Sequence, residues 1–243
     1  PDVGYCTLVE AVADAADSGD ILQLQADIAI PATVTVNKAL TLDLNGKVAT
    51  YSTTDNSYAL EVNGAAAALT VVDGVSPSTG KILVVDADVD GVTDGRGIGI
   101  LSGSLTLNSG TIQAPYAGVY VRPGTSMVMN SGTIGGSVDP LYGIVILGTD
   151  SSLDINGGVI ESTYFAVSGN GTAGYGGTTI TIDGGTLTST TAAAIYHPQD
   201  GNMTITGGTI SGINGIEMKA GNLVVTGGTI LGTGAYADPV AND

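Results

Sequence analysis

The feature that most constrains this chain is a short unit that recurs from residue 104 towards the C-terminus. The clearest copy, Ser104–Ile112, alternates apolar and polar residues, turns at Asn-Ser-Gly and ends in Thr-Ile. The glycine that closes this turn recurs with spacings of 22, 26, 27, 23 and 20 residues, at Gly110, Gly132, Gly158, Gly185, Gly208 and Gly228. A period of about 20–27 residues built from short β-type units is typical of a solenoid.

Each unit carries the pattern of three short strands. Leu105 and Leu107 alternate with polar residues, which predicts a strand with one buried face. Asn and Gly then turn the chain, because both tolerate positive φ. A second strand is expected to stack its apolar residues inside: Ile112, Ile134, Ile160, Leu187, Ile210 and Ile230. A third strand follows the pattern Gly-apolar-x-apolar, as in Gly97–Ile100 and Gly118–Val121.

No unit of this kind can bury its own apolar face, so each coil depends on its neighbours. The sequence therefore predicts an all-β fold, a single-stranded right-handed parallel β-helix with three short strands per coil. An amphipathic segment precedes it, in which Leu8 and Val12 fall on one stripe. Because an open solenoid end exposes strand edges and core, we expect an N-terminal capping α-helix within residues 1–20 and the β-helix over residues 21–243.

Three segments at the start of the chain resemble a known family. Residues 7–12, 19–24 and 39–46 look like the opening of pectin-lyase-like right-handed parallel β-helix repeat domains of bacterial cell-surface proteins. The resemblance covers about the first fifth of the chain, and the Gly-Gly-Thr-Ile coils extend it to the end. It implies the fold and an extracellular or cell-surface bacterial location. Enzymes on this fold act on acidic polysaccharides, through calcium and a basic residue or through neighbouring carboxylates.

Composition limits the classes of partner. The 243 residues show no composition break and indicate one domain. Six basic against 23 acidic residues give a net charge of −17, which argues against nucleic acid or an anionic membrane as partner. No apolar run approaches 18 residues, so no membrane span is expected. The single cysteine, Cys6, excludes an internal disulfide framework and is interpreted as a small core residue.

An acidic segment interrupts the repeat between residues 73 and 96. Asp86, Asp88 and Asp90 followed by Gly91 match the first half of a calcium loop, and Asp94 falls at the ninth position. The twelfth position holds glycine in place of the bidentate glutamate of an EF-hand, so the match is to calcium loops in general. The sequence thus predicts a Ca²⁺ site, the alternative being a solvated acidic loop that bulges from one coil.

No catalytic residue is predicted. Asp154 and Asp183 are expected at near-equivalent outward places on successive coils, where a pair of carboxylates is able to do acid–base work. Such residues are more often solvated positions of an outer face. His197 has no motif partner and is expected on the surface or in a turn. A polysaccharide-active lyase or hydrolase stays the alternative function.

Tyrosines recur around the third strand of the coil. Several stand at its entrance and two at outward positions inside it. If the columns align, they form aromatic steps that stack on sugar rings or peptide planes. The predicted ligand-binding face consists of Tyr116, Tyr120, Arg122, Tyr142, Tyr164 and Tyr196. The alternative is an aromatic stack that shields the edges of the coils.

These observations predict a non-catalytic secreted or cell-surface module with an adhesive, glycan-binding role or a structural role in a stalk or filament. The expected partner is a polysaccharide or a host surface ligand. The coil that begins at Gly227 is expected to make an end-to-end contact with another domain or subunit.

Overall fold

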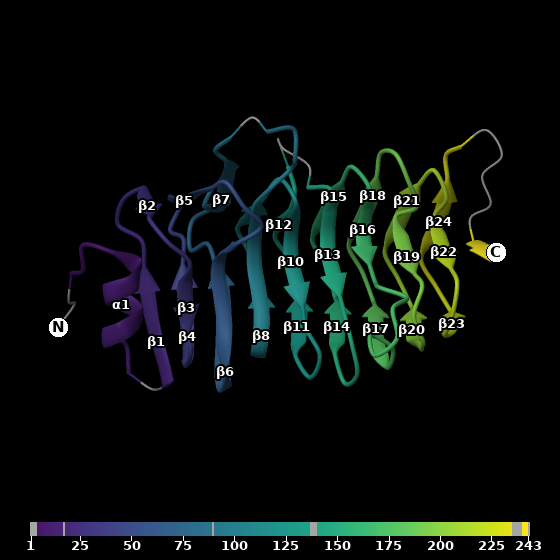
Figure 1. Cartoon of the computed structure of the whole chain (residues 1–243), viewed down its shortest axis with the longest axis horizontal. Helices are drawn as coiled ribbons and strands as arrows, with labels where there is room; N and C mark the ends of the chain where they lie inside the picture. The colour runs from purple at the N-terminus through teal and green to yellow at the C-terminus, as the bar shows by residue number, and fades with distance from the viewer. Residues whose placement is uncertain (1–3, 17, 89, 137–139, 235–239, 243) are drawn as a thin grey trace.

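The protein is a parallel β-helix whose coils lie side by side along one axis (Figure 1). The structure is a computed structural model that describes residues 4–16, 18–88, 90–136, 140–234 and 240–242. Strands of successive coils pair in parallel along the whole stack. The predicted all-β parallel solenoid with one N-terminal helix is confirmed.

The three strands of each coil form three faces. Two faces, called sheet 1 and sheet 2, are continuous through two long strands and form one 16-stranded sheet, and the third face, called sheet 3, is a separate nine-stranded sheet. Sheet 1 contains β3 (Val34–Val36), β10 (Ala117–Val121), β13 (Tyr142–Ile146), β16 (Phe165–Ser168), β19 (Ile195–His197), β22 (Ile216–Met218) and β25 (Val240–Asn242). Sheet 2 contains β1 (Ser18–Gln23), β4 (Ala39–Asp43), β11 (Ser126–Met129), β14 (Ser152–Ile155), β17 (Thr178–Ile182), β20 (Gly201–Ile205) and β23 (Asn222–Val225). Two long strands, β6 (Tyr58–Val72) and β8 (Arg96–Leu107), run through the corner between these sheets and belong to both.

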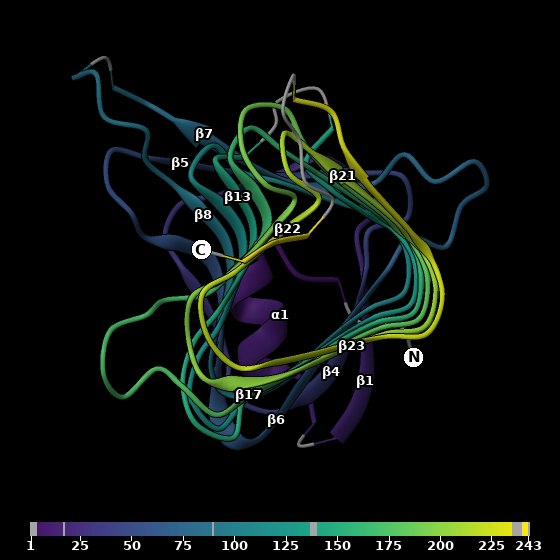
Figure 2. The same cartoon turned by 90° about the vertical axis from the view of Figure 1, so that its right-hand side faces the viewer.

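Sheet 3 closes each coil. It contains β2 (Ile28–Ile30), β5 (Val48–Thr53), β7 (Lys81–Asp86), β9 (Thr111–Gln113), β12 (Thr133–Ile134), β15 (Val159–Ser162), β18 (Thr186–Ser189), β21 (Thr209–Gly212) and β24 (Thr229–Gly232). Viewed along the axis, the later coils nearly superimpose, and loops of the earlier coils together with one green loop of a later coil project from the common outline (Figure 2).

Aliphatic ladders fill the interior. On sheet 3, Ile112, Ile134, Ile160, Leu187 and Ile210 pair in register from strand to strand and are fully buried, as predicted. Ile230 continues the ladder on β24 and is only partly buried. Because burial of an aliphatic side chain contributes about 1.5–3 kcal/mol, the ladders are the main source of cohesion between coils.

Glycine and asparagine have different roles in the turn between sheets 2 and 3. The six glycines that close the turn all have φ between +82° and +90°, a region that favours glycine. Asn108, Asn130 and Asn156 do not adopt positive φ, contrary to the prediction. Their side chains form a ladder instead, in which Asn130 Nδ2 donates to Asn108 Oδ1 and Asn156 Nδ2 donates to Asn130 Oδ1, both at 2.8 Å.

Helix α1 (Leu8–Asp14) lies across the N-terminal end of the stack (Figures 1 and 2). Thr7 Oγ1 accepts a hydrogen bond from the Glu10 amide at 3.2 Å, and Glu10 Oε2 accepts one from the Thr7 amide at 3.1 Å. This capping box satisfies two amides that a helix start leaves unpaired. Leu8 and Val12 are buried in the core of the first coils, so the predicted cap is confirmed.

Two details of this region differ from expectation. Strand β1 begins at Ser18 and not at residue 21, because residues 18–20 already pair with the start of β4. Cys6 is exposed and not a core residue, because it precedes the helix and lies outside its buried stripe. Among the described residues, no helix is both long and apolar enough to cross a membrane.

Candidate functional site

Strand register places the predicted aromatic residues on the outer face of sheet 1. Tyr58, Arg96, Ala117, Tyr142 and Phe165 occupy one column on five neighbouring strands. A second column carries the outward residues Tyr120 and Tyr196, with Val145 and Ser168 between them. Tyr116 and Tyr164 each precede a strand of this sheet by one residue. All six predicted ligand-face residues therefore lie on or beside one sheet.

The rings form two groups, Tyr58 with Tyr120 and a second group from Tyr116 to Tyr196. Together we call them the aromatic track: Tyr58, Tyr116, Tyr120, Tyr142, Tyr164, Phe165 and Tyr196. Its ring centroids lie 6.0 Å apart for Tyr58–Tyr120, 5.5 Å for Tyr116–Tyr142 and 6.1 Å for Tyr142–Phe165. Phe165 and Tyr196 stack at 4.9 Å with an interplanar angle of 15°. These separations are those of favourable aromatic pairs.

Arg96 connects the pair of Tyr58 and Tyr120 with Tyr116, which has no ring contact with either of them. Its Cζ lies 5.4, 5.0 and 4.8 Å from the ring centroids of Tyr58, Tyr116 and Tyr120. Nη1 of Arg96 also donates to the Asn56 carbonyl at 2.7 Å. Arg122 lies over Tyr120 at 5.7 Å and donates from Nη2 to the Tyr58 hydroxyl at 3.3 Å. Cations over ring faces within about 6 Å are attracted by the ring quadrupole.

Burial keeps the phenols neutral. Burial, together with the neighbouring Tyr116, raises the pKa of Tyr120 far above its usual value. Burial and the nearby phenols of Tyr116 and Tyr164 also raise the pKa of Tyr142. The hydroxyls of these two residues therefore remain hydrogen-bond donors at neutral and mildly alkaline pH.

Three rings of the track pack against the protein on one side, and most rings are partly exposed to solvent on the other. Tyr116, Tyr120 and Tyr142 pack on a small apolar cluster of Ala117, Val145 and Leu147 that lies outside the main core. Tyr164 is 47% exposed, and the other rings from Tyr116 to Tyr196 are partly exposed. Rings held from beneath and free on one side offer fixed platforms to a ligand, since little side-chain entropy remains to be lost.

Two members of this face were missed by the sequence interpretation. Arg96 precedes Gly97 just as Ala117 precedes Gly118, so the Gly-apolar pattern already carried its register. Phe165 precedes Ala166-Val167, a copy of the same pattern with alanine in place of glycine. Beyond Tyr196, the outward column continues with Glu217, whose Oε1 lies 3.1 Å from Lys219 Nζ.

The acidic loop joins β7 to β8 and ends directly before Arg96. Carboxylate oxygens of Asp88, Asp90 and Asp94 all lie within 4.8 Å of one another. Asp86, the fourth predicted ligand, turns elsewhere: its Oδ2 accepts from the Asp94 amide at 3.1 Å and its Oδ1 from the Asp88 amide at 3.4 Å. Three of the four predicted residues are thus brought together, and Asp86 shapes the loop.

The environment of this loop disfavours negative charge. Burial and the carboxylates of Asp86 and Asp90 raise the pKa of Asp94 above its usual value. Burial likewise raises the pKa of Asp88, with added repulsion from Asp90 and Asp86. A bound cation would reverse both effects, because an opposite charge favours the ionised carboxylate.

The expected carboxylate pair of Asp154 and Asp183 does not form. Asp154 pairs with Thr181 on the next coil. Asp183 lies two residues further on and its amide donates to the Ile155 carbonyl at 2.8 Å, so it continues the asparagine column. The repeat itself carried this register, because alignment of the two copies on Gly158 and Gly185 places Asp183 opposite Asn156 and Thr181 opposite Asp154.

His197 is buried, contrary to the expectation of a surface or turn residue. It is 1% exposed. Nδ1 donates to the Ala220 carbonyl at 3.1 Å, and Nε2 lies 3.4 Å from Thr178 Oγ1. Burial lowers the pKa of His197 below its usual value, so the neutral imidazole is a structural hydrogen-bonding group between three coils.

We expect this histidine to make folding sensitive to mild acid. Because its folded pKa is lowered, its contribution is present above the unfolded pKa of about 6.5 and is lost as the pH falls below it. Urea unfolding at pH 7.5 and pH 5.5 should show a loss of about 1 kcal/mol or less for the native chain. The variant His197→Asn should lose less stability between these pH values; an equal loss would contradict this role.

Comparisons with known proteins do not assign this chain to a family. No protein-family model, no curated protein and no solved structure matches it. The parallel β-helix is therefore assigned from strand pairing and burial, and the function has to be argued from the aromatic track and the loop beside it.

Proposed function

We propose that this chain is a non-catalytic binding module of a secreted or cell-surface bacterial protein, built on a pectin-lyase-like β-helix, and that it holds a polysaccharide along the aromatic track. The observation that carries the proposal is the unbroken row of ring and arginine contacts across six neighbouring strands of sheet 1, from Tyr58 on β6 to Tyr196 on β19. The residues between these ends come from coils far apart in sequence.

The length and chemistry of the track suit an extended sugar chain. Tyr58 is buried, so the exposed part of the row runs from Tyr120 on β10 to Tyr196 on β19. Neighbouring strands lie about 4.8 Å apart, so this part extends for about 14 Å. Aromatic faces pack on the apolar faces of sugar rings, and neutral phenols donate hydrogen bonds to their hydroxyls. Two of the six basic residues of the chain, Arg96 and Arg122, lie in the track. The surface therefore suits neutral polysaccharides and those that carry occasional acidic groups.

The test is binding of the whole chain to a panel of neutral and acidic polysaccharides by isothermal titration calorimetry. Tyr142→Ala and Tyr196→Ala each remove one ring from the track, and each should weaken binding about three- to tenfold, as loss of one stacking contact implies. Tyr142→Phe keeps the ring and should retain most of the affinity.

Tyr5→Ala is the matched control, because Tyr5 is an exposed tyrosine beside α1 at the N-terminal end of the stack and is not part of the aromatic track. It should bind as the native chain does. Absence of binding to every polysaccharide, or affinity unchanged in Tyr142→Ala and Tyr196→Ala, would remove the track from this role. Release of new reducing ends or unsaturated products during incubation would replace the binding module with an enzyme.

The C-terminal coils carry exposed apolar side chains that suit contact with a further domain or subunit. Val224, Val225 and Leu231 on β23 and β24 are 52%, 45% and 46% exposed. Neighbouring exposed apolar side chains mark contact surfaces. An end-to-end contact with a further domain or subunit stays a prediction of the same stalk or adhesin role.

A further inference from the structure

The acidic loop between β7 and β8 has a feature that an ordinary solvated loop lacks. Asp94 is only 6% exposed. No donor of the described residues forms a hydrogen bond with its carboxylate. Asp88 is half-buried, and its Oδ1 atom is buried without a hydrogen-bond partner. Buried polar groups are nearly always paired, and a buried unpaired carboxylate is costly. The described part of the folded chain therefore supplies no hydrogen-bond partner for these oxygens.

Among the residues that the structure describes, no basic side chain forms an ion pair with the loop. Arg96 is the nearest basic residue in sequence, but its guanidinium lies over the rings of Tyr58, Tyr116 and Tyr120 and donates to the Asn56 carbonyl. Within the described part of the chain, the ion pair formed is that of Lys219 with Glu217, on another coil. Three converging carboxylates thus face one another with no positive charge between them.

The ligand set selects the kind of cation. Carboxylate oxygens are the ligands of hard cations such as Ca²⁺, whereas zinc and copper sites favour nitrogen and sulfur. Ca²⁺ takes oxygen ligands at 2.3–2.6 Å, so oxygens on opposite sides of one ion lie about 5 Å apart. The oxygens of Asp88, Asp90 and Asp94, all within 4.8 Å of one another, fit around such an ion. Mg²⁺ requires shorter bonds and a stricter octahedron.

We infer that Asp88, Asp90 and Asp94 bind one Ca²⁺ ion and that the ion fixes the loop against the coil that carries Arg96. Asp86 is not a ligand and holds the loop backbone, because its two carboxylate oxygens accept hydrogen bonds from the amides of Asp88 and Asp94. Water completes the coordination shell, as the exposed side of Asp90 allows. This site is independent of what the aromatic track binds.

The test is calorimetric titration of the chelator-treated whole chain with CaCl₂, at physiological ionic strength to screen diffuse attraction to the acidic surface. We expect saturable uptake of one ion per chain and a melting temperature that rises with calcium. Asp94→Asn and Asp88→Asn should weaken calcium binding at least about tenfold. Asp200→Asn, an exposed carboxylate on another loop, should leave it unchanged.

A second measurement separates loss of the ion from loss of the fold. In chelator, Asp94→Asn should melt at or above the temperature of the native chain, because it removes a buried unpaired charge. A lower melting temperature in chelator would show that Asp94 has a structural partner, and would overturn the inference. So would the absence of a saturable calcium heat, equal affinity for MgCl₂, or binding unchanged in Asp94→Asn.

Discussion

Replacing Asp73 with alanine is expected to lower the free energy of unfolding by about 3–5 kcal/mol. Asp73 follows β6 and is 7% exposed. Its Oδ2 accepts hydrogen bonds from Ser78 Oγ at 2.8 Å and from the amides of Thr79 and Gly80 at 2.8 and 2.7 Å, and its Oδ1 accepts from the Gly46 amide at 2.6 Å. Alanine would leave these donors unpaired, which costs more than the net value of the bonds.

The effect should depend on pH in a defined direction. Burial acts to raise the pKa of Asp73, but the hydrogen bonds from Gly80, Gly46, Ser78 and Thr79 outweigh it and lower the pKa. Its contribution is therefore present above the unfolded pKa of about 3.9 and is lost as the pH falls through the lower folded pKa. Urea unfolding of native and Asp73→Ala chains should differ most near neutral pH and least in strong acid.

Asp200→Ala is the matched control, since Asp200 is exposed, and it should change stability by less than about 0.5 kcal/mol. A similarly small effect of Asp73→Ala would show that water replaces the carboxylate at no cost.

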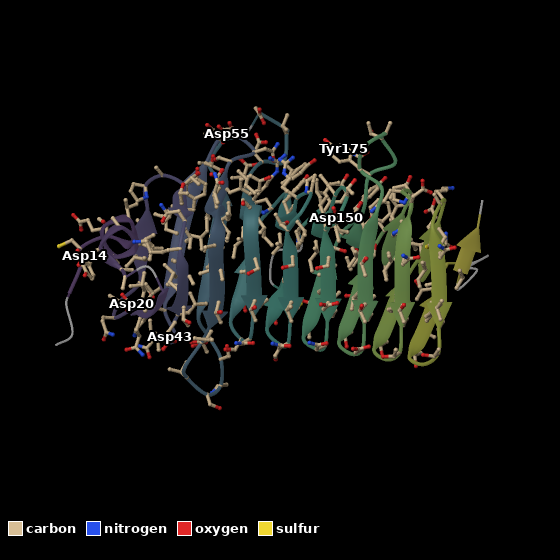
Figure 3. All side chains as sticks on the ribbon, turned by 90° about the horizontal axis from the view of Figure 1, so that it is seen from below. Asp14, Asp20, Asp43, Asp55, Asp150 and Tyr175 are labelled. Carbon is tan, nitrogen blue, oxygen red and sulfur yellow. The ribbon has the colours of Figure 1, made fainter. Side chains whose placement is uncertain are left out.

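Asp43 has a similar role in the preceding coil, where its Oδ1 accepts hydrogen bonds from the amides of Asn45 and Gly74. Asp43 lies at the edge of the molecule opposite to Asp55 and Tyr175 (Figure 3).

The second large effect concerns a column of small residues beneath the aromatic track. On the sheet 1 strands from β6 to β22, the residue before the buried aliphatic is glycine or alanine: Ala59, Gly97, Gly118, Gly143, Ala166, Ala194 and Gly215. At Gly143 an added Cβ would lie 2.5 Å from the Ala166 carbonyl oxygen and 2.4 Å from Ile160 Cγ2. The coils approach too closely here for a larger side chain.

Gly143→Val is expected to destabilise the fold by about 3 kcal/mol, at the upper end of overpacking effects, because the neighbouring coil must move. Gly143→Ala should cost less, about 1–2 kcal/mol, because it adds the Cβ that meets the Ala166 oxygen and Ile160 Cγ2 but not the two further methyl groups of valine. Thermal and urea unfolding of the two variants measure the difference. Valine that is tolerated as well as alanine would mean that the spacing of the coils is not fixed at this corner. Tyr142 precedes this position, so the valine variant should also disturb the track.

The sequence alone determined the architecture, because period-two patterning and a recurrent turn are local properties that only stacked coils can satisfy. Leu105, Ile112 and the capping segment around Leu8 were recognisable in this way, since apolar residues must be buried wherever the coil places them. It also identified the tyrosines and arginine of the candidate face, and the acidic loop, as groups of residues with suitable chemistry.

The tertiary structure decided which of those residues meet. Coils of 20 to 27 residues differ in length, so contact between coils follows hydrogen-bond register and not sequence spacing. That register brings Arg96 and Phe165 into the aromatic track and buries His197 between coils. The physical reason is that a side chain on one coil contacts those about 4.8 Å above and below it, and loops of unequal length set which residues these are.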